Sequence, residues 1–224
     1  MRLRAWRKPA ALVCALACAT TPIAGCGAGS APPIAPSELA AAKTFPYYTT
    51  YWVGPTFHGH PVTAADGVAG YKPSVGDSVY YGDCLRSKGI LAGGGCLLPL
   101  QVTTAIYTPR PNFTLGRQHN VLIRGVPAAV YDEGRAIELY TGRLAIDLFS
   151  DSDRDAQAAA RLLRPLNRPG SDRRPLPAPV FCPPLEGPRT PAVRHAMEHL
   201  PGMACQRAAT ALAYQQALEG EGGG

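Results

Sequence analysis

The segment AIELYTGRLAIDL, residues 136–148, decides the fold, because an apolar side chain occupies every second position on each side of a Thr-Gly pair. Ile137 and Leu139 share one face before that pair, and the aliphatic residues from Leu144 to Leu148 share one face after it. A period of two is typical of a strand with one buried face. The segment therefore predicts an antiparallel hairpin.

The same alternation extends towards the N-terminus. Residues 100–107 place Leu, Val, Thr and Ile on one face, and residues 121–123 and 128–131 are two further strand pieces. Pro127, in the Gly-Val-Pro that separates them, cannot donate to a sheet ladder, which predicts an edge, a bulge or a bend. With a turn at residues 132–134 ending on Gly134, the whole region predicts an antiparallel meander.

Residues 152–164 change to a helical period. Ala156, Ala159, Ala160 and Leu163 recur at helical spacing, and Ser152 is suited to cap the first turn. A sheet with one apolar face, covered by one amphipathic helix, predicts an α+β domain of two layers over residues 45–167.

The C-terminal part is rich in proline and then helical. Residues 168–179 predict a Pro/Arg linker, and residues 180–219 predict a small helical appendage with helices near 191–199 and 203–218. Residues 220–224, which are almost all glycine, predict a mobile tail.

The N-terminus has the composition of an export signal. Residues 1–8 carry four basic residues and no acidic one, and residues 9–25 form a short apolar run. The run is shorter than the roughly 20 residues a membrane span needs. Residues 1–25 therefore predict a removable signal peptide.

The signal is followed by Ile23-Ala24-Gly25-Cys26, which resembles the lipobox of bacterial lipoproteins. The resemblance implies that Cys26 receives a diacylglyceryl group, which would hold the protein outside the cell on its membrane. Residues 26–44 then form a lipidated N-terminus and flexible tether. The alternative is an ordinary cleaved signal in which Cys26 stands by chance.

Removal of the signal also changes the charge. The chain has 22 basic and 16 acidic residues, but four of the basic ones lie in residues 1–8, which leaves 18 against 16. Nucleic-acid binding requires a clustered basic face, and the densest remaining cluster is Arg168, Arg173 and Arg174 in the Pro-rich segment. We therefore expect no nucleic-acid partner.

Four cysteines remain once the two in the signal and Cys26 are assigned: Cys84, Cys96, Cys182 and Cys205. An even number in an exported protein predicts two disulfides. Of the three pairings, Cys84 with Cys96 and Cys182 with Cys205 close local loops, each worth about 3 kcal/mol. The second pair would staple the helical appendage. A four-cysteine metal site is the alternative, although no C-x-x-C pair is present.

Residues 45–57 concentrate aromatic side chains. Tyr48, Tyr51, Trp52 and Phe57 are candidates for a binding platform that stacks on sugar or on a partner, and the alternative is strand residues packed on a core.

Several short motifs share a wider resemblance: Tyr51-Trp52-Val53-Gly54, Phe57, Gly59, Pro61-Val62-Thr63, Tyr81-Gly82-Asp83-Cys84, residues 96–100 and residues 124–128. Together they resemble uncharacterised secreted lipoproteins of actinobacteria. The resemblance implies no activity and brings no catalytic residues.

Two histidine pairs are candidate metal ligands. His195-Ala196-Met197-Glu198-His199 matches the H-x-x-E-H pattern, in which two histidines share zinc and Glu198 is the base. Pro201 ends that helix, and only Glu219 and Glu221 follow as acidic ligands, so we expect two solvent-facing histidines instead. His58-Gly59-His60 lies in a predicted loop without an identifiable third ligand.

No nucleophile motif and no phosphate loop occurs in the sequence. We therefore expect a membrane-anchored binding or envelope-interaction module that requires no cofactor, with an envelope protein or a carbohydrate as its partner. The alternatives are a metal-dependent hydrolase that uses His195, Glu198 and His199, and a regulator of a membrane partner.

Overall fold

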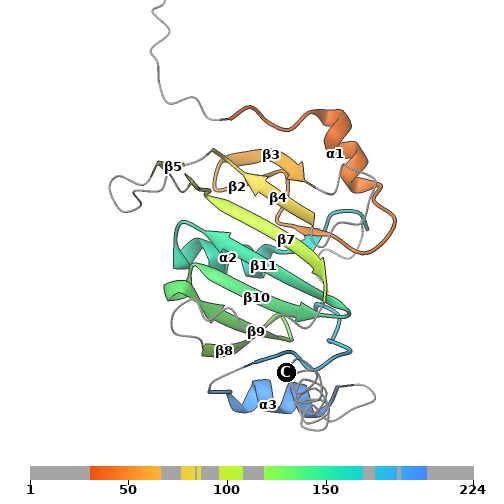
Figure 1. The fold of residues 1–224 in the computed structure, drawn as a ribbon, viewed down its shortest axis with the longest axis vertical. Helices are drawn as coiled ribbons and strands as arrows, with labels where there is room; N and C mark the ends of the chain where they lie inside the picture. Colours follow the sequence, from red (N-terminus) through yellow and green to blue (C-terminus); the bar gives the residue numbers. More distant parts are fainter. Residues whose placement is uncertain are drawn as a thin grey trace, which may run out of the picture.

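The computed structural model describes residues 31–66, 77–83, 85–86, 96–107, 119–168, 175–185 and 188–200. Within these residues the protein is an α+β fold with three α-helices and an eight-stranded antiparallel sheet of order β2-β3-β4-β7-β11-β10-β9-β8 (Figure 1).

The strands of this sheet are β2 (Thr56–Phe57), β3 (His60–Asp66), β4 (Asp77–Tyr81), β7 (Leu100–Ile106), β8 (His119–Ile123), β9 (Val126–Tyr131), β10 (Ala136–Thr141) and β11 (Leu144–Ser150). Two short pairs lie outside it, β1 (Tyr51–Trp52) with β12 (Arg164–Pro165) and β5 (Leu85–Arg86) with β6 (Cys96–Leu97). The helices are α1 (Pro36–Lys43), α2 (Asp153–Leu162) and α3 (Pro191–Glu198), with one 3-10 turn, η1 (Asp132–Gly134).

The predicted meander is confirmed as β8 to β11, in which each strand pairs antiparallel with the next. The break near residue 125 is a two-residue hairpin turn, with φ of 49° at Arg124 and 85° at Gly125. Pro127 lies inside β9 opposite Leu122, just before the β9–β10 pairing begins at Ala128. Its missing N–H therefore falls outside the β10 ladder, and the edge strand is β8.

The strand predicted at residues 100–107 is present as β7, but its predicted place in the meander is wrong, because β7 does not pair with β8. It pairs with β11 on one side and with β4 on the other, and β3 and β2 continue the sheet from there. The apolar face of the whole sheet builds the main core, with Leu100, Val102, Ile146 and Leu148 fully buried.

Helix α2 covers that apolar face, as the sequence predicts. The Ser152 hydroxyl accepts a hydrogen bond from the Asp155 amide at 3.1 Å and caps the helix. The buried side of α2 consists of Ala156, Ala159 and Ala160, small side chains that let the helix lie close to β10 and β11.

The folded part begins earlier than the predicted boundary at residue 45. The Ile34 amide donates to the Val62 carbonyl of β3 at 2.8 Å, and the Ala42 side chain on α1 is fully buried. The predicted tether of residues 26–44 is therefore too long at its C-terminal end, because Ile34 and Ala42 bury apolar surface against the sheet.

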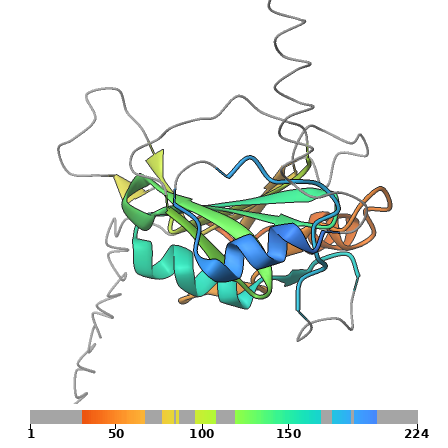
Figure 2. The same cartoon turned by 90° about the horizontal axis from the view of Figure 1, so that it is seen from below.

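The C-terminal residues also belong to the fold. On α3, Val193 and Met197 pack in a second apolar cluster with Ala129, Tyr131 and Tyr140, which lie on the sheet face opposite α2. Figure 2 shows α2 along one face of the sheet and the chain that leads into α3 across the other. The prediction of one covering helix is thus correct for one face and incomplete for the other.

The predicted linker takes part in the same packing. Leu176 joins the main core, and the Pro177 carbonyl accepts hydrogen bonds from the Thr141 hydroxyl at 2.7 Å and the Gly142 amide at 3.2 Å. Residues 175–179 are therefore held against the β10–β11 turn.

Several predictions concern other parts of the chain. The lipobox, the second helix at 203–218 and the glycine tail lie outside the described residues, as do Cys205 and the side chains of Cys84 and Cys96. The two disulfide pairings stay predictions. In the described part of the chain, no helix has the length and apolar character to span a membrane.

Candidate functional site

The four aromatic residues considered for an exposed platform lie in the core. Tyr48, Tyr51, Trp52 and Phe57 are each at most 9% exposed. Phe45 packs edge-on against Tyr48, with ring centroids 5.0 Å apart. The alternative interpretation as core residues fits the structure, and a solvent-facing platform made of these four side chains does not.

The histidine pairs lie at opposite edges of the sheet. His58 and His60 belong to the β2–β3 hairpin, whereas His195 and His199 lie on α3, which packs beside β8 and β9. The two pairs therefore do not converge, and in the part of the chain that the structure describes no group of three or more potential ligands could hold a metal ion.

Each histidine pair has local partners. His58 Nδ1 lies 3.0 Å from Asp155 Oδ1 at the start of α2. On α3, the rings of His195 and His199 stack with centroids 4.1 Å apart, and His199 Nδ1 lies 2.8 Å from the His195 carbonyl oxygen. Glu198 is exposed beside them.

A row of polar side chains crosses the sheet on the face opposite α2. The strand registers align Ser78 of β4 with Thr103 of β7, Thr103 with Asp147 of β11, and Asp147 with Glu138 of β10. Directly opposed residues of antiparallel strands lie on the same face. We call Ser78, Thr103, Asp147 and Glu138 the polar row.

Hydrogen bonds organise one end of the polar row. The hydroxyl oxygens of Ser78 and Thr103 are 2.7 Å apart, and the Gln101 amide donates to Thr103 Oγ1 at 3.0 Å. Asp147 is only 6% exposed, while Glu138 and Thr103 are half-buried. The row crosses four neighbouring strands, so at the usual spacing between strands it is about 14 Å long.

The other end of the polar row is set among tyrosines. Burial raises the pKa of Tyr140, and the charge of Glu138 and its hydrogen bond to the Tyr140 hydroxyl raise it further. Burial also raises the pKa of Tyr107, and the Glu138 charge adds to this. Both phenols are therefore protonated at neutral pH, and Tyr140 donates to Glu138.

Aromatic stacking fixes this tyrosine end in place. The ring of Tyr107 stacks on Phe181 with centroids 3.6 Å apart, and both rings meet Tyr140 edge-on at 6.2 Å. Phe181 belongs to the chain that crosses this face before α3. The C-terminal segment thus helps to position the phenol that contacts Glu138.

Sequence reasoning missed the polar row, because its acidic residues occupy ordinary polar positions of alternating strands. Glu138 and Asp147 are the acidic residues at outward-facing positions of a hairpin whose turn places them opposite each other. Two carboxylates therefore lie side by side on this face of the sheet. Chemically, the row offers carboxylate acceptors and hydroxyl groups, which bind ligands rich in hydroxyl or amino groups.

Comparison of the chain with protein-family models, with curated proteins and with solved structures finds no match.

Proposed function

We propose that this protein is a lipoprotein held outside the cytoplasmic membrane through Cys26, and that its domain is a binding module for an envelope carbohydrate. The binding surface is formed by the half-buried Glu138 and Thr103 of the polar row, and Asp147 and Ser78 are buried beside them. The observation that carries the proposal is the direct opposition of Glu138 and Asp147, with hydroxyl groups continuing the row across β7 and β4.

The chemistry of the row favours a carbohydrate. Sugar hydroxyl groups donate to carboxylates and exchange hydrogen bonds with Ser and Thr hydroxyls. Phe149, which is 39% exposed on the same face of β11, offers an apolar surface beside the row for the C–H groups of a sugar ring.

The position of the domain agrees with a lipid anchor. The first core residue, Ile34, follows Cys26 by eight residues, and it is bonded to β3 at the edge region of the sheet. An extended segment of that length reaches at most about 28 Å. A domain anchored in this way stays close to the membrane, within the envelope.

An oxidising compartment also fits the cysteines. We propose the pairs Cys84–Cys96 and Cys182–Cys205. Cys182 packs beside the second apolar cluster, and disulfides persist in exported proteins.

The anchor is tested with labelled palmitate in the bacterial host. The full chain is expected to take up label and to fractionate with membranes, and Cys26→Ser should lose both properties. Label retained by Cys26→Ser would contradict lipidation at this residue.

The binding surface is tested by calorimetric titration with polysaccharide extracted from the cell envelope. We expect saturable binding by the wild-type chain and at least tenfold weaker binding by Glu138→Gln, because this variant loses the charged acceptor of the binding surface. Glu133→Gln is the matched control, since Glu133 is an exposed carboxylate outside the row in η1. Equal affinities of all variants, or no saturable binding, would refute the carbohydrate site.

A further inference from the structure

The outward side of α2 carries two arginines. Arg154 and Arg161 are exposed and seven residues apart, so they lie on the same side of the helix two turns from each other. In the part of the chain that the structure describes, neither forms an ion pair. The first turn also carries two acidic residues, Asp155, which is engaged by His58, and the exposed Asp153. Leu162, in the last turn, is 53% exposed.

Two further cations continue this side of the molecule and meet on Trp52. Lys43 Nζ lies 5.6 Å and Arg164 Cζ lies 5.4 Å from the centre of the Trp52 ring. Arg164 follows α2 directly in β12, and Lys43 ends α1. The two cations share one indole, which fixes the end of α1 beside the end of α2.

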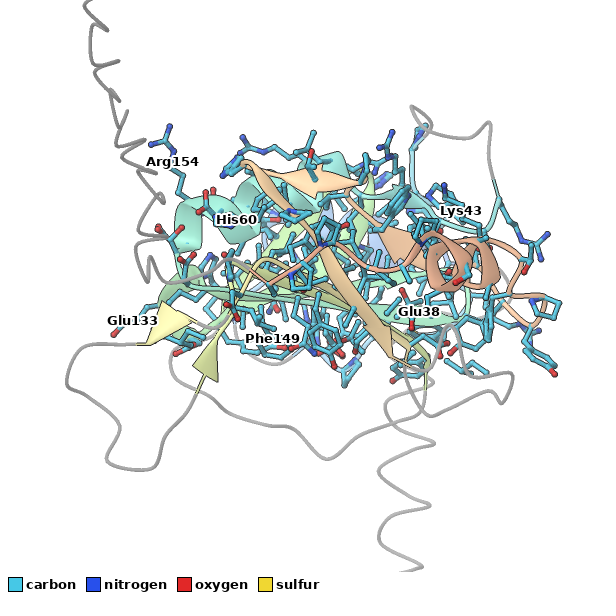
Figure 3. All side chains as sticks on the ribbon, turned by 90° about the horizontal axis from the view of Figure 1, so that it is seen from above. Glu38, Lys43, His60, Glu133, Phe149 and Arg154 are labelled. Atoms are coloured by element: carbon cyan, nitrogen blue, oxygen red, sulfur yellow. The ribbon has the colours of Figure 1, made fainter. Side chains whose placement is uncertain are left out.

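The charge is divided between the two faces of the sheet. Figure 3 shows Lys43 and Arg154 on the side of the sheet that α2 covers, and Glu38, Glu133 and Phe149 on the opposite side. We call Lys43, Arg154, Arg161 and Arg164 the basic face. The acidic members of the polar row lie on the other face.

The basic face lies near the edge from which the predicted tether leaves. Ile34 is bonded to β3, and the His58–Asp155 contact holds the start of α2 to the β2–β3 hairpin. The eight residues from Cys26 to Ile34 span at most about 28 Å. A lipid at Cys26 would therefore keep the membrane surface within a short distance of α2.

We propose that the basic face docks on the anionic phospholipid headgroups of the membrane that holds the lipid anchor. This inference rests on the proposed function, since it takes the membrane at Cys26 as given. Cations near an anionic bilayer are attracted to it, and Leu162 inserts an apolar side chain at the interface. Docking in this orientation directs the polar row away from the membrane, towards the envelope.

The test uses the whole mature chain with Cys26→Ser, so that no lipid contributes to binding. Flotation with phosphatidylglycerol vesicles is expected to recover the protein at low salt, and phosphatidylcholine vesicles are not. Each arginine contributes about fivefold in affinity, so Arg154→Gln with Arg161→Gln should weaken binding by about 25-fold. Added salt should weaken it as well.

The control is Arg143→Gln with Arg194→Gln, two exposed arginines outside the basic face, on the β10–β11 turn and on α3. Equal losses in both double variants, equal binding to the two kinds of vesicle, or no binding to phosphatidylglycerol would overturn the proposal. Palmitate labelling of the wild-type chain reports anchoring separately. If the wild-type chain takes up palmitate but its Cys26→Ser form does not bind anionic vesicles, the docking proposal is refuted and the proposed anchor stands.

Discussion

Asn167 joins the two ends of the main domain through three hydrogen bonds to backbone groups. Its Nδ2 donates to the Phe45 carbonyl at 2.7 Å and to the Tyr48 carbonyl at 2.6 Å. Its Oδ1 accepts from the Thr50 amide at 3.0 Å, and Thr50 is only 1% exposed. One side chain thus satisfies the backbone of a segment more than a hundred residues away.

Replacement of Asn167 by alanine removes all three bonds and leaves their backbone partners in a buried loop. Each lost bond costs about 1 kcal/mol, and a buried group left unsatisfied costs more. We expect the free energy of unfolding to fall by about 3 kcal/mol. For a urea dependence of about 2 kcal/mol per molar, the midpoint of unfolding falls by about 1.5 M.

Urea unfolding followed by tryptophan fluorescence measures this change directly. Trp52 is the only tryptophan outside the signal, and it is buried between Lys43 and Arg164. Gln157→Ala, an exposed polar truncation on α2, is the control and should change stability by less than about 0.5 kcal/mol. A midpoint for Asn167→Ala that equals that of the control would refute the role of these bonds.

Three further predictions concern stability. Met197→Ala should lower the free energy of unfolding by about 2–4 kcal/mol within a single thermal transition, because Met197 is 4% exposed against the sheet; an unchanged main transition would mean that α3 folds separately. Gly54→Ala should cost about 1–3 kcal/mol in a urea titration, since φ is 122° and an added Cβ would lie 2.4 Å from Arg164 Nη2; wild-type stability would contradict this. Burial raises the pKa of Tyr140, so the neutral phenol stabilises the fold below pH 10, and this stabilisation falls by about 1.4 kcal/mol per pH unit above 10. Urea unfolding at pH 9 and at pH 11 should show a smaller loss of stability between the two pH values for Tyr140→Phe than for the wild-type chain. Equal losses in the two proteins would exclude this tyrosine as the source.

The local elements of the fold could be predicted because each depends on neighbouring residues. The β8–β11 meander follows from alternation and tight turns, and α2 follows from its cap and its row of alanines. The insertion of β4 between β3 and β7, by contrast, depends on pairings between residues that are 12 to 27 positions apart. No local period encodes such pairings.

The same limit applies to the surfaces. Asp147 and Glu138 each match the polar position of an ordinary strand, and only their register shows that two carboxylates oppose each other. Similarly, Val193 and Met197 predict an amphipathic helix, but their spacing does not say which face of which sheet they cover. The sequence favours Trp52 as a core residue over a platform residue, but the two cations on its ring appear only in three dimensions.

The pairing of β7 with β11 means that β7 is synthesised well before one of its two partner strands. Ile106 pairs with Leu144 and Leu100 with Ser150, so the partner strand is synthesised about 40 to 50 residues after β7. At about 5–20 residues per second, the newly made chain carries β7 with one open edge for roughly 2–10 s. Leu100 and Val102 are exposed during that interval, and an unpaired apolar edge is a template for aggregation. Holding chaperones should therefore bind the nascent chain most strongly between the completion of β7 and the arrival of β11.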